Sequence, residues 1–219
     1  MPVTLRRFVL SLLIVPLAIA LGGAGQSVPK RRVEFSKADR EDLTRVSDYL
    51  NSIRTLKGDF VQIGPQGQLD QGTFYLQKPG RIRFEYLPPN PTLIVSDGRT
   101  VAVANKKLKT VDRYPLSATP LDLILADEID LEHNSAILAV VHQSGTITVL
   151  ARTSTNRNTA NIRLIFSDPA IELRQWTVID DQGLSTTVAL RALEPGAVIP
   201  GSLFVLPDMK KPVGVKSRD

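Results

Sequence analysis

The sequence predicts an α+β protein in which a large antiparallel sheet of about eleven strands is covered by two or three helices. Three observations predict this class. From Gly58 onward apolar residues recur at every second position, turn residues separate these runs at short intervals, and helical spacing is confined to short segments. The chain has 219 residues, 42% of them hydrophobic and 22% charged, which suffices for one domain with a substantial core.

The first helix is predicted to begin after Ser36 and to run to about Leu56. Ser36 and Asp39 have the residue types and spacing of a capping box. Apolar residues then follow at three- and four-residue spacing, at Leu43, Val46, Leu50 and Ile53. Such a narrow stripe requires a surface to lie on.

The strand pattern is clearest from Gly72 to Gly98, where Pro79-Gly80 and Asp97-Gly98 mark turns between alternating runs. The predicted strands are 58–63, 69–77, 81–87, 92–96, 99–104, 108–113, 137–142, 146–152, 161–167, 171–180 and 184–192, with a last short one at 203–206.

A second helix is predicted after Thr119, which has the type of a cap residue, with Pro120 at the first helical position and four apolar residues by Leu125. Connections such as Ser144-Gly145 are short enough for hairpins, so the sheet should be antiparallel. An antiparallel sheet of this size must curl, close or split.

The two ends of the chain are expected to lie outside this domain. Residues 1–24 have the composition of a cleaved signal peptide, with an uncleaved membrane anchor as the alternative. Residues 25–35 are predicted to be a flexible basic linker, 36–207 the domain and 208–219 a basic tail. Basic residues at both ends predict either solvated tails or attraction to anionic lipid headgroups. The chain has no cysteine, so it offers no site for lipid attachment.

Several short motifs follow the predicted amphipathic helix, namely Gly58-Asp59-Phe60-Val61-Gln62, Gly72 to Tyr86 around Lys78-Pro79, Ile94-Val95-Ser96-Asp97-Gly98, Thr119-Pro120-Leu121, Trp176 with Asp181-Gln182-Gly183, and Phe204-Val205-Leu206-Pro207. In this order the motifs resemble those of the LolA-type outer-membrane lipoprotein carriers. None is specific alone, but together they extend over most of Ser36 to Pro207.

The resemblance implies a single-domain, unclosed and strongly curved antiparallel barrel whose hollow is covered by helices. It implies a periplasmic carrier that binds the acyl chains of lipoproteins released from the inner membrane and delivers them to the outer membrane. The implied partners are acylated lipoproteins, an ATP-driven inner-membrane lipoprotein-releasing transporter, and an outer-membrane receptor or the outer-membrane surface. We expect a monomer without catalytic residues, cofactor, metal or nucleic-acid partner.

By the same resemblance Leu50, Phe60, Ile82 and Phe84 fall at cavity or entrance positions. Alternation along the strands adds five more residues to the predicted acyl-chain cavity, namely Phe74, Leu76, Tyr86, Leu93 and Val95. Ordinary core packing is the alternative for each of them. Together they are expected to line a hollow rather than to fill it.

The family has an arginine before the proline of Lys78-Pro79, where it latches the lid by hydrogen bonds. Lysine offers a point charge instead of a planar fork, so the resemblance implies a weaker latch at Lys78. A solvated lysine is the alternative, and Arg81 is a second candidate for the latch.

Other functions find less support in the residues. The chain has no cysteine nucleophile, Gly-x-Ser-x-Gly elbow or His-Glu-x-x-His motif, and His133 and His142 have no third ligand motif around them. A lipid-binding or envelope-sensing domain on the same architecture remains open, because fold does not determine function. A purely structural module would have a filled core.

Overall fold

The computed structural model describes residues 33–154, 159–180 and 182–208. The predicted signal peptide, most of the linker and nearly all of the C-terminal tail therefore lie outside the described residues. The helices are α1 (Lys37–Ser52) and α2 (Asp122–Leu125), with 3-10 turns η1 (Leu116–Ala118) and η2 (Gly201–Phe204). The strands are β1 (Thr55–Ile63), β2 (Leu69–Gln77), β3 (Arg81–Tyr86), β4 (Thr92–Asp97), β5 (Thr100–Asn105), β6 (Thr110–Pro115), β7 (Ile137–Gln143), β8 (Thr146–Ser154), β9 (Thr159–Ser167), β10 (Glu172–Ile179) and β11 (Ser185–Pro195).

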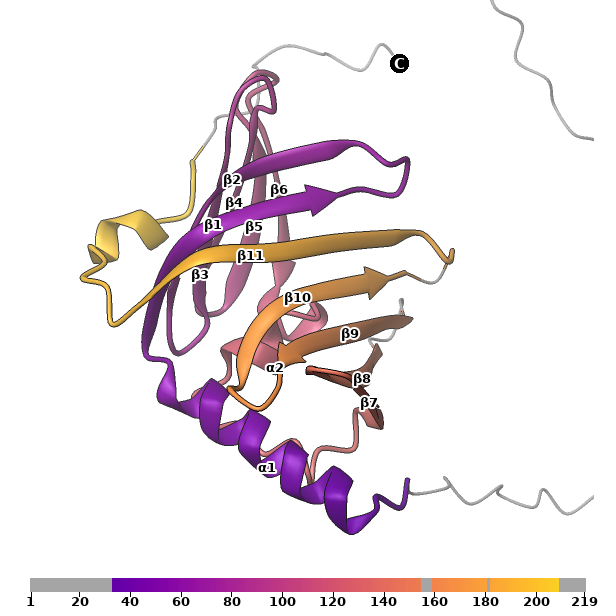
Figure 1. Cartoon of the computed structure of the whole chain (residues 1–219). Helices are drawn as coiled ribbons and strands as arrows, with labels where there is room; N and C mark the ends of the chain where they lie inside the picture. Colours follow the sequence, from indigo (N-terminus) through magenta and orange to yellow (C-terminus); the bar gives the residue numbers. More distant parts are fainter. Residues whose placement is uncertain (1–32, 155–158, 181, 209–219) are drawn as a thin grey trace, which may run out of the picture. The chain divides into compact units, whose positions relative to one another are not determined.

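All eleven strands form one antiparallel sheet in the order β6-β5-β4-β3-β2-β1-β11-β10-β9-β8-β7. The first and last strands of the chain pair with each other at its centre, where Phe60 lies opposite Leu190. Strands β6 and β7 are the two ends of this order, so the sheet is not closed. Figure 1 shows the sheet curving around the side on which α1 and α2 lie, which confirms the predicted fold class.

Helix α1 begins as predicted but ends earlier. The Ser36 hydroxyl accepts a hydrogen bond from the Asp39 backbone N–H, and the Asp39 carboxylate accepts one from the Ser36 N–H, which completes the capping box. The apolar stripe of α1 is buried, with Leu43 and Val46 at 0% exposure. The prediction that α1 reaches Leu56 was wrong, because Ile53 is already extended and Thr55 pairs with Gln77 in the sheet.

Two smaller predictions were also wrong. Helix α2 begins at Asp122 with Leu121 as its N-cap, and the hydroxyl of Thr119 donates backward to the Leu116 carbonyl instead of capping α2. The predicted last strand at 203–206 is replaced by the 3-10 turn η2. Phe204 of this turn is buried, so apolar character alone did not distinguish a strand from a short turn packed on the sheet.

The core lies on the concave side, where the sheet meets α1 and α2. Aromatic residues of neighbouring strands form its centre: the ring of Phe60 lies 5.1 Å from that of Phe84 and 5.0 Å from that of Tyr86, edge to face in both pairs. A smaller cluster of Leu93, Val95 and Ala104 packs separately with Val111 and Leu206.

Gly72 is a point of close approach between β2 and β3. A Cβ atom at this position would lie 2.0 Å from the Glu85 carbonyl oxygen, which is backbone and cannot move freely. We expect Gly72→Ala to lower the free energy of unfolding by roughly 3 kcal/mol through overpacking, as measured by urea denaturation. A Cβ atom added at Gly201 would meet no other atom within 4 Å. Gly201→Ala is therefore the control, and equal losses in both variants would contradict the close approach.

Candidate functional site

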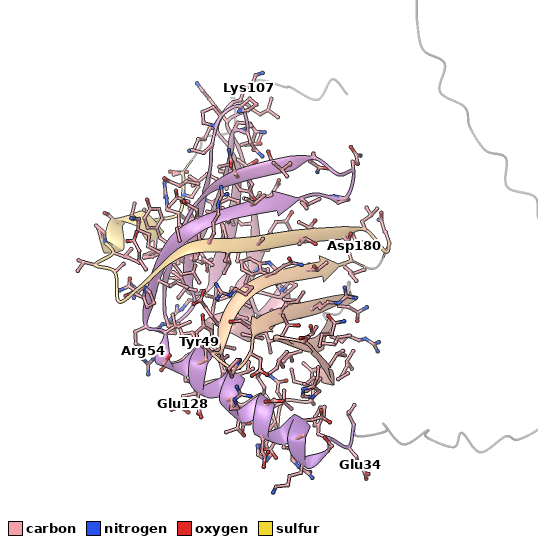
Figure 2. All side chains as sticks on the ribbon, viewed as in Figure 1. Glu34, Tyr49, Arg54, Lys107, Glu128 and Asp180 are labelled. Atoms are coloured by element: carbon pink, nitrogen blue, oxygen red, sulfur yellow. The ribbon has the colours of Figure 1, made fainter. Side chains whose placement is uncertain are left out.

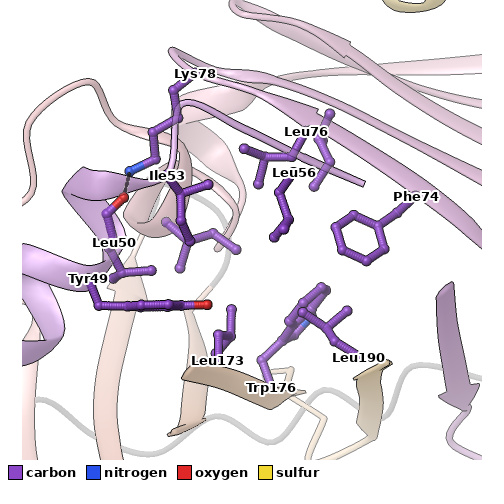
Figure 3. A pocket seen from close by; sticks show the side chains of 12 residues that line it. Tyr49, Leu50, Ile53, Leu56, Phe74, Leu76, Lys78, Leu173, Trp176 and Leu190 are labelled. Carbon is purple, nitrogen blue, oxygen red and sulfur yellow. Dashed lines mark hydrogen bonds between the residues drawn. The ribbon is translucent and has the colours of Figure 1, made fainter. Parts of the chain in front are cut away.

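A narrow apolar cavity lies between the concave face of the sheet and the two helices (Figure 3). Its lining comes from α1, α2 and the strands β1, β2, β3, β10 and β11, and from Ile53 and Lys78, which directly follow α1 and β2. The lining residues are Tyr49, Leu50, Ile53, Leu56, Phe74, Leu76, Lys78, Ile82, Ile124, Leu173, Trp176 and Leu190. Lys78 is the one side chain of this set that carries a charge.

The cavity is almost filled by its own lining. Its free volume is about 20 Å³, whereas a pocket for a small ligand occupies about 300 to 1,000 Å³. The expectation that the lining residues surround a hollow instead of filling it was therefore wrong for this conformation. A long acyl chain would not fit into this conformation. We refer to α1 and α2, which lie over the concave face of the sheet (Figure 1), as the lid.

Seven of the nine predicted cavity residues face this side of the sheet. Leu50, Phe74, Leu76 and Ile82 line the cavity itself. Phe60, Phe84 and Tyr86 belong to the same core, and Phe84 continues to the cavity wall through Trp176, whose ring centre is 6.1 Å away.

Leu93 and Val95 were assigned to the wrong face. In the register of β3 and β4, Leu93 lies opposite Glu85 and Val95 opposite Arg83, whereas Ile94 lies opposite the core residue Phe84. Leu93 and Val95 therefore point to the convex face, where they pack in the smaller cluster with Leu206. Alternation identified which residues share a face, but it did not identify which face is concave.

Lys78 joins the sheet to the first helix of the lid. Its ammonium Nζ donates a 2.8 Å hydrogen bond to the Leu50 carbonyl, which lies in the last turn of α1, and the side chain is buried (Figure 3). The last carbonyls of a helix have no partner within the helix and favour a nearby cation. Lys78 thus acts as a cap supplied by a distant segment of the chain.

The turn that follows Lys78 also holds α2. The backbone N–H of Gly80 donates a 2.8 Å hydrogen bond to the carbonyl of Leu125, the last residue of α2. The Gly80 carbonyl in turn accepts a 2.7 Å hydrogen bond from the Ser96 hydroxyl on β4. One turn, Lys78 to Gly80, therefore fixes both helices of the lid, and we call it the latch turn.

Arg81 does not take part in the latch. It lies one position from Ile82 and so on the opposite face, and its guanidinium donates a 3.2 Å hydrogen bond to the Gln77 side chain of the same hairpin. The prediction of Arg81 as a second latch residue was therefore wrong.

The N-terminal half of α1 is held by charged groups instead. Arg45 donates hydrogen bonds of 2.7 Å to Asp42 and to Asp168, and His142 of β7 lies 3.1 Å from the Asp39 carboxylate. Hydrogen bonds from Ser36 and His142 lower the pKa of Asp39 below its usual value. His133 lies apart from His142 and contacts Asp130, at 2.8 Å.

Burial lowers the pKa of Lys78 from 10.5 to about 8, and Arg54 adds to the effect. Between these pH values the unfolded chain holds more protons than the folded one, so stability rises with pH. We expect the free energy of unfolding to increase by about 2 kcal/mol from pH 7 to pH 9.5, as measured by urea denaturation. Burial raises the pKa of Tyr86 to about 12, so the opposing effect of this tyrosine begins only above about pH 10.

The control for this prediction is Lys78→Met, which keeps the length of the side chain and removes its titration. Its stability is expected to change little over the same pH range. An equal rise in the variant would assign the pH dependence to other groups.

Sequence reasoning missed seven lining residues. Trp176 and Leu190 come from β10 and β11, which reach the cavity only because β11 pairs with β1. Ile53 and Leu56 carried a usable signal, since one continues the apolar stripe of α1 and the other alternates with Phe60. The others are Tyr49, Ile124 and Leu173.

Comparison with known proteins confirms the family that the motifs indicated. The model of the family described as outer membrane lipoprotein carrier protein LolA matches residues 51–207, which include the whole sheet, α2 and the latch turn. The chain belongs to the LolA family. Other members resemble it along most of its length: an outer-membrane lipoprotein carrier protein of Legionella pneumophila is 30% identical over 83% of this chain and 90% of its own.

A second relative of this LolA family member, an outer-membrane lipoprotein carrier protein of Dechloromonas aromatica, is 26% identical over 73% of this chain and 80% of its own. A solved structure from Vibrio parahaemolyticus, described as a putative outer membrane lipoprotein-sorting protein domain, is 9% identical over 75% of this chain and 93% of its own, with a TM-score of 0.44. In the described part of the chain, no helix is long and apolar enough to cross a membrane.

Proposed function

We propose that this LolA family member carries acylated lipoproteins and holds their acyl chains in the cavity between the sheet and the lid. The observation that supports this most directly is the lining, in which a continuous apolar surface is interrupted by one charged side chain, Lys78. Each CH₂ group removed from water contributes roughly 0.8 kcal/mol, so acyl chains leave a membrane only for another apolar environment. The names of the relatives agree with such a cargo.

The proposed route runs through the periplasm, from the inner to the outer membrane. An ATP-driven lipoprotein-releasing transporter in the inner membrane would supply the cargo, and an outer-membrane receptor or the outer-membrane surface would accept it. The signal-like residues 1–24 support export of the chain. Binding and release need no bond to be made or broken, so the role requires no catalytic group, and a monomer suffices.

Binding in this cavity requires a second conformation. The closed conformation leaves about 20 Å³, so the cargo-competent state is one in which the lid has moved and the latch turn has released α1. Cargo shifts the protein toward that state only by the difference in its affinity for the two conformations. The energy of the latch therefore sets both the apparent affinity and the ease of release.

Trp176 provides a direct test, because it lines the cavity and is the single tryptophan of the chain. A lipopeptide whose acyl chains carry bromine atoms should quench the fluorescence of Trp176 at stoichiometric concentrations. The same lipopeptide without acyl chains is the control and should not quench. Absence of quenching by the acylated form would refute binding in this cavity.

A release assay separates the carrier from its alternative. The purified protein is incubated with spheroplasts that contain an acylated lipoprotein, and a soluble one-to-one complex is expected. If brominated free fatty acid quenches Trp176 but no lipoprotein is released, a lipid-binding or envelope-sensing role replaces the carrier role.

A further inference from the structure

The hairpin between β5 and β6 ends in a basic tip with one exposed apolar residue. Residues Lys106, Lys107 and Lys109 surround Leu108, whose side chain is 64% exposed. Among the residues that the structure describes, none of the three lysines forms an ion pair. The apolar cavity and its lid explain none of these features.

The backbone of the tip is fixed rather than loose. The Asn105 side chain accepts hydrogen bonds from the N–H groups of Lys107, at 3.0 Å, and Leu108, at 2.8 Å. Lys109 has a φ of 55°, in the left-handed region, and the Lys106 N–H donates to the Pro91 carbonyl at 2.9 Å. Because the backbone around Leu108 is already ordered, inserting this side chain into an apolar environment carries little entropy cost from ordering of the loop.

The tip lies far from the lid. Figure 2 shows Lys107 at the opposite end of the sheet from Glu34 and α1. A surface that contacts the tip therefore leaves the lid free to move.

We propose that this tip docks the protein on a membrane surface rich in anionic phospholipid, with the three lysines at the headgroups and Leu108 inserted among them. Lysines flanking an apolar side chain match the interfacial layer of a bilayer, where charge lies beside hydrocarbon. The inference rests on the proposed function, because the tip would be the part of the carrier that first contacts the membrane during delivery. Docking itself needs no cargo.

Vesicle co-sedimentation of the full, empty chain tests the proposal. The protein should bind phosphatidylcholine vesicles that contain phosphatidylglycerol and should not bind pure phosphatidylcholine vesicles. The triple variant Lys106→Gln, Lys107→Gln, Lys109→Gln should weaken binding on the order of 100-fold. Leu108→Ser should weaken it about tenfold, through the lost insertion of the side chain.

Matched controls distinguish the tip from the total charge. The triple variant Arg152→Gln, Arg163→Gln, Arg174→Gln removes the same charge from exposed positions on β8, β9 and β10, and Val198→Ser removes an apolar side chain that is 99% exposed. Both controls should bind vesicles nearly as the unchanged chain does. Equal losses in the lysine and arginine triples, or no binding to anionic vesicles, would overturn the proposal.

Quenching of Trp176 by a brominated lipopeptide is measured on the same variants. Because the tip is remote from the cavity, quenching should be unchanged in the lysine triple. If the brominated lipopeptide does not quench Trp176 in the unchanged chain, cargo binding is refuted, and vesicle docking is then judged separately.

Discussion

Replacing Ile82 with glutamate should weaken binding of an acylated lipopeptide on the order of 100-fold or more. Ile82 is 1% exposed, lies opposite Leu76 in the β2–β3 pair and lines the cavity. A carboxylate at this position either stays charged and draws water into the cavity or takes up a proton at a cost, and both outcomes remove apolar surface from the acyl chain. Trp176 quenching measures the affinity.

Leu93→Glu is the matched control, because Leu93 is also buried but packs on the convex face. Both variants should lose stability through a buried carboxyl group, but only Ile82→Glu should lose acyl binding. Since Ile82→Glu can fail to fold, Ile82→Thr serves as the milder variant, with about tenfold weaker binding expected. Equal effects of Ile82→Thr and Leu93→Thr on binding would contradict the assignment of the concave face as the acyl site.

Lys78→Glu should hold the lid open. In the closed conformation the new carboxylate would face the Leu50 carbonyl, so an acceptor replaces the donor of a 2.8 Å hydrogen bond at the negative end of α1. Hydrogen bonds to charged groups contribute about 1.5 to 3 kcal/mol, so we expect a roughly 10- to 100-fold increase in amide exchange over the last turns of α1. Quenching of Trp176 by acrylamide should increase in parallel.

The control is Lys37→Glu, which makes the same change of charge at a side chain of α1 that is 90% exposed. It should leave both the amide exchange and the acrylamide quenching unchanged. Acid provides a second check on Lys78→Glu. Once protonated, the new carboxyl group can donate to the Leu50 carbonyl, so the lid should close again as the pH falls. A variant that stays open at every pH would indicate damaged packing instead of a lost latch.

The error at Leu93 and Val95 shows where alternation along a strand stops being informative. The period of two correctly grouped Leu93 with Val95, and Ile82 with Phe84. The faces of β3 and β4 are related by their register, and this places Ile94, not Leu93, beside Phe84. The connection between the strands sets that register, and a shift of one residue exchanges the two faces of the whole strand.

The contact between Lys78 and α1 could not be predicted from the sequence for a different reason. The resemblance pointed to Lys78, but the sequence does not contain the distance between its ammonium and a carbonyl 28 residues earlier. The choice between Lys78 and Arg81 depended on which of the two lies on the side of the helices. Only the closed hairpin of β2 and β3, with its turn pressed against α1 and α2, decides this.

Sequence patterns were enough to predict most elements of this protein, but not the end of α1, the start of α2 or the turn η2. The correct predictions were the capping box and stripe of α1, the eleven strands of the sheet, the antiparallel class and the family. These features are local or recur along the chain, so periodicity, turn residues and ordered motifs reveal them. Three other features emerged only from the folded chain: the pairing of β1 with β11, the concave face of β4, and a cavity nearly filled by side chains. Such features depend on contacts between residues far apart in the chain, where register and packing volume, rather than local pattern, determine the outcome.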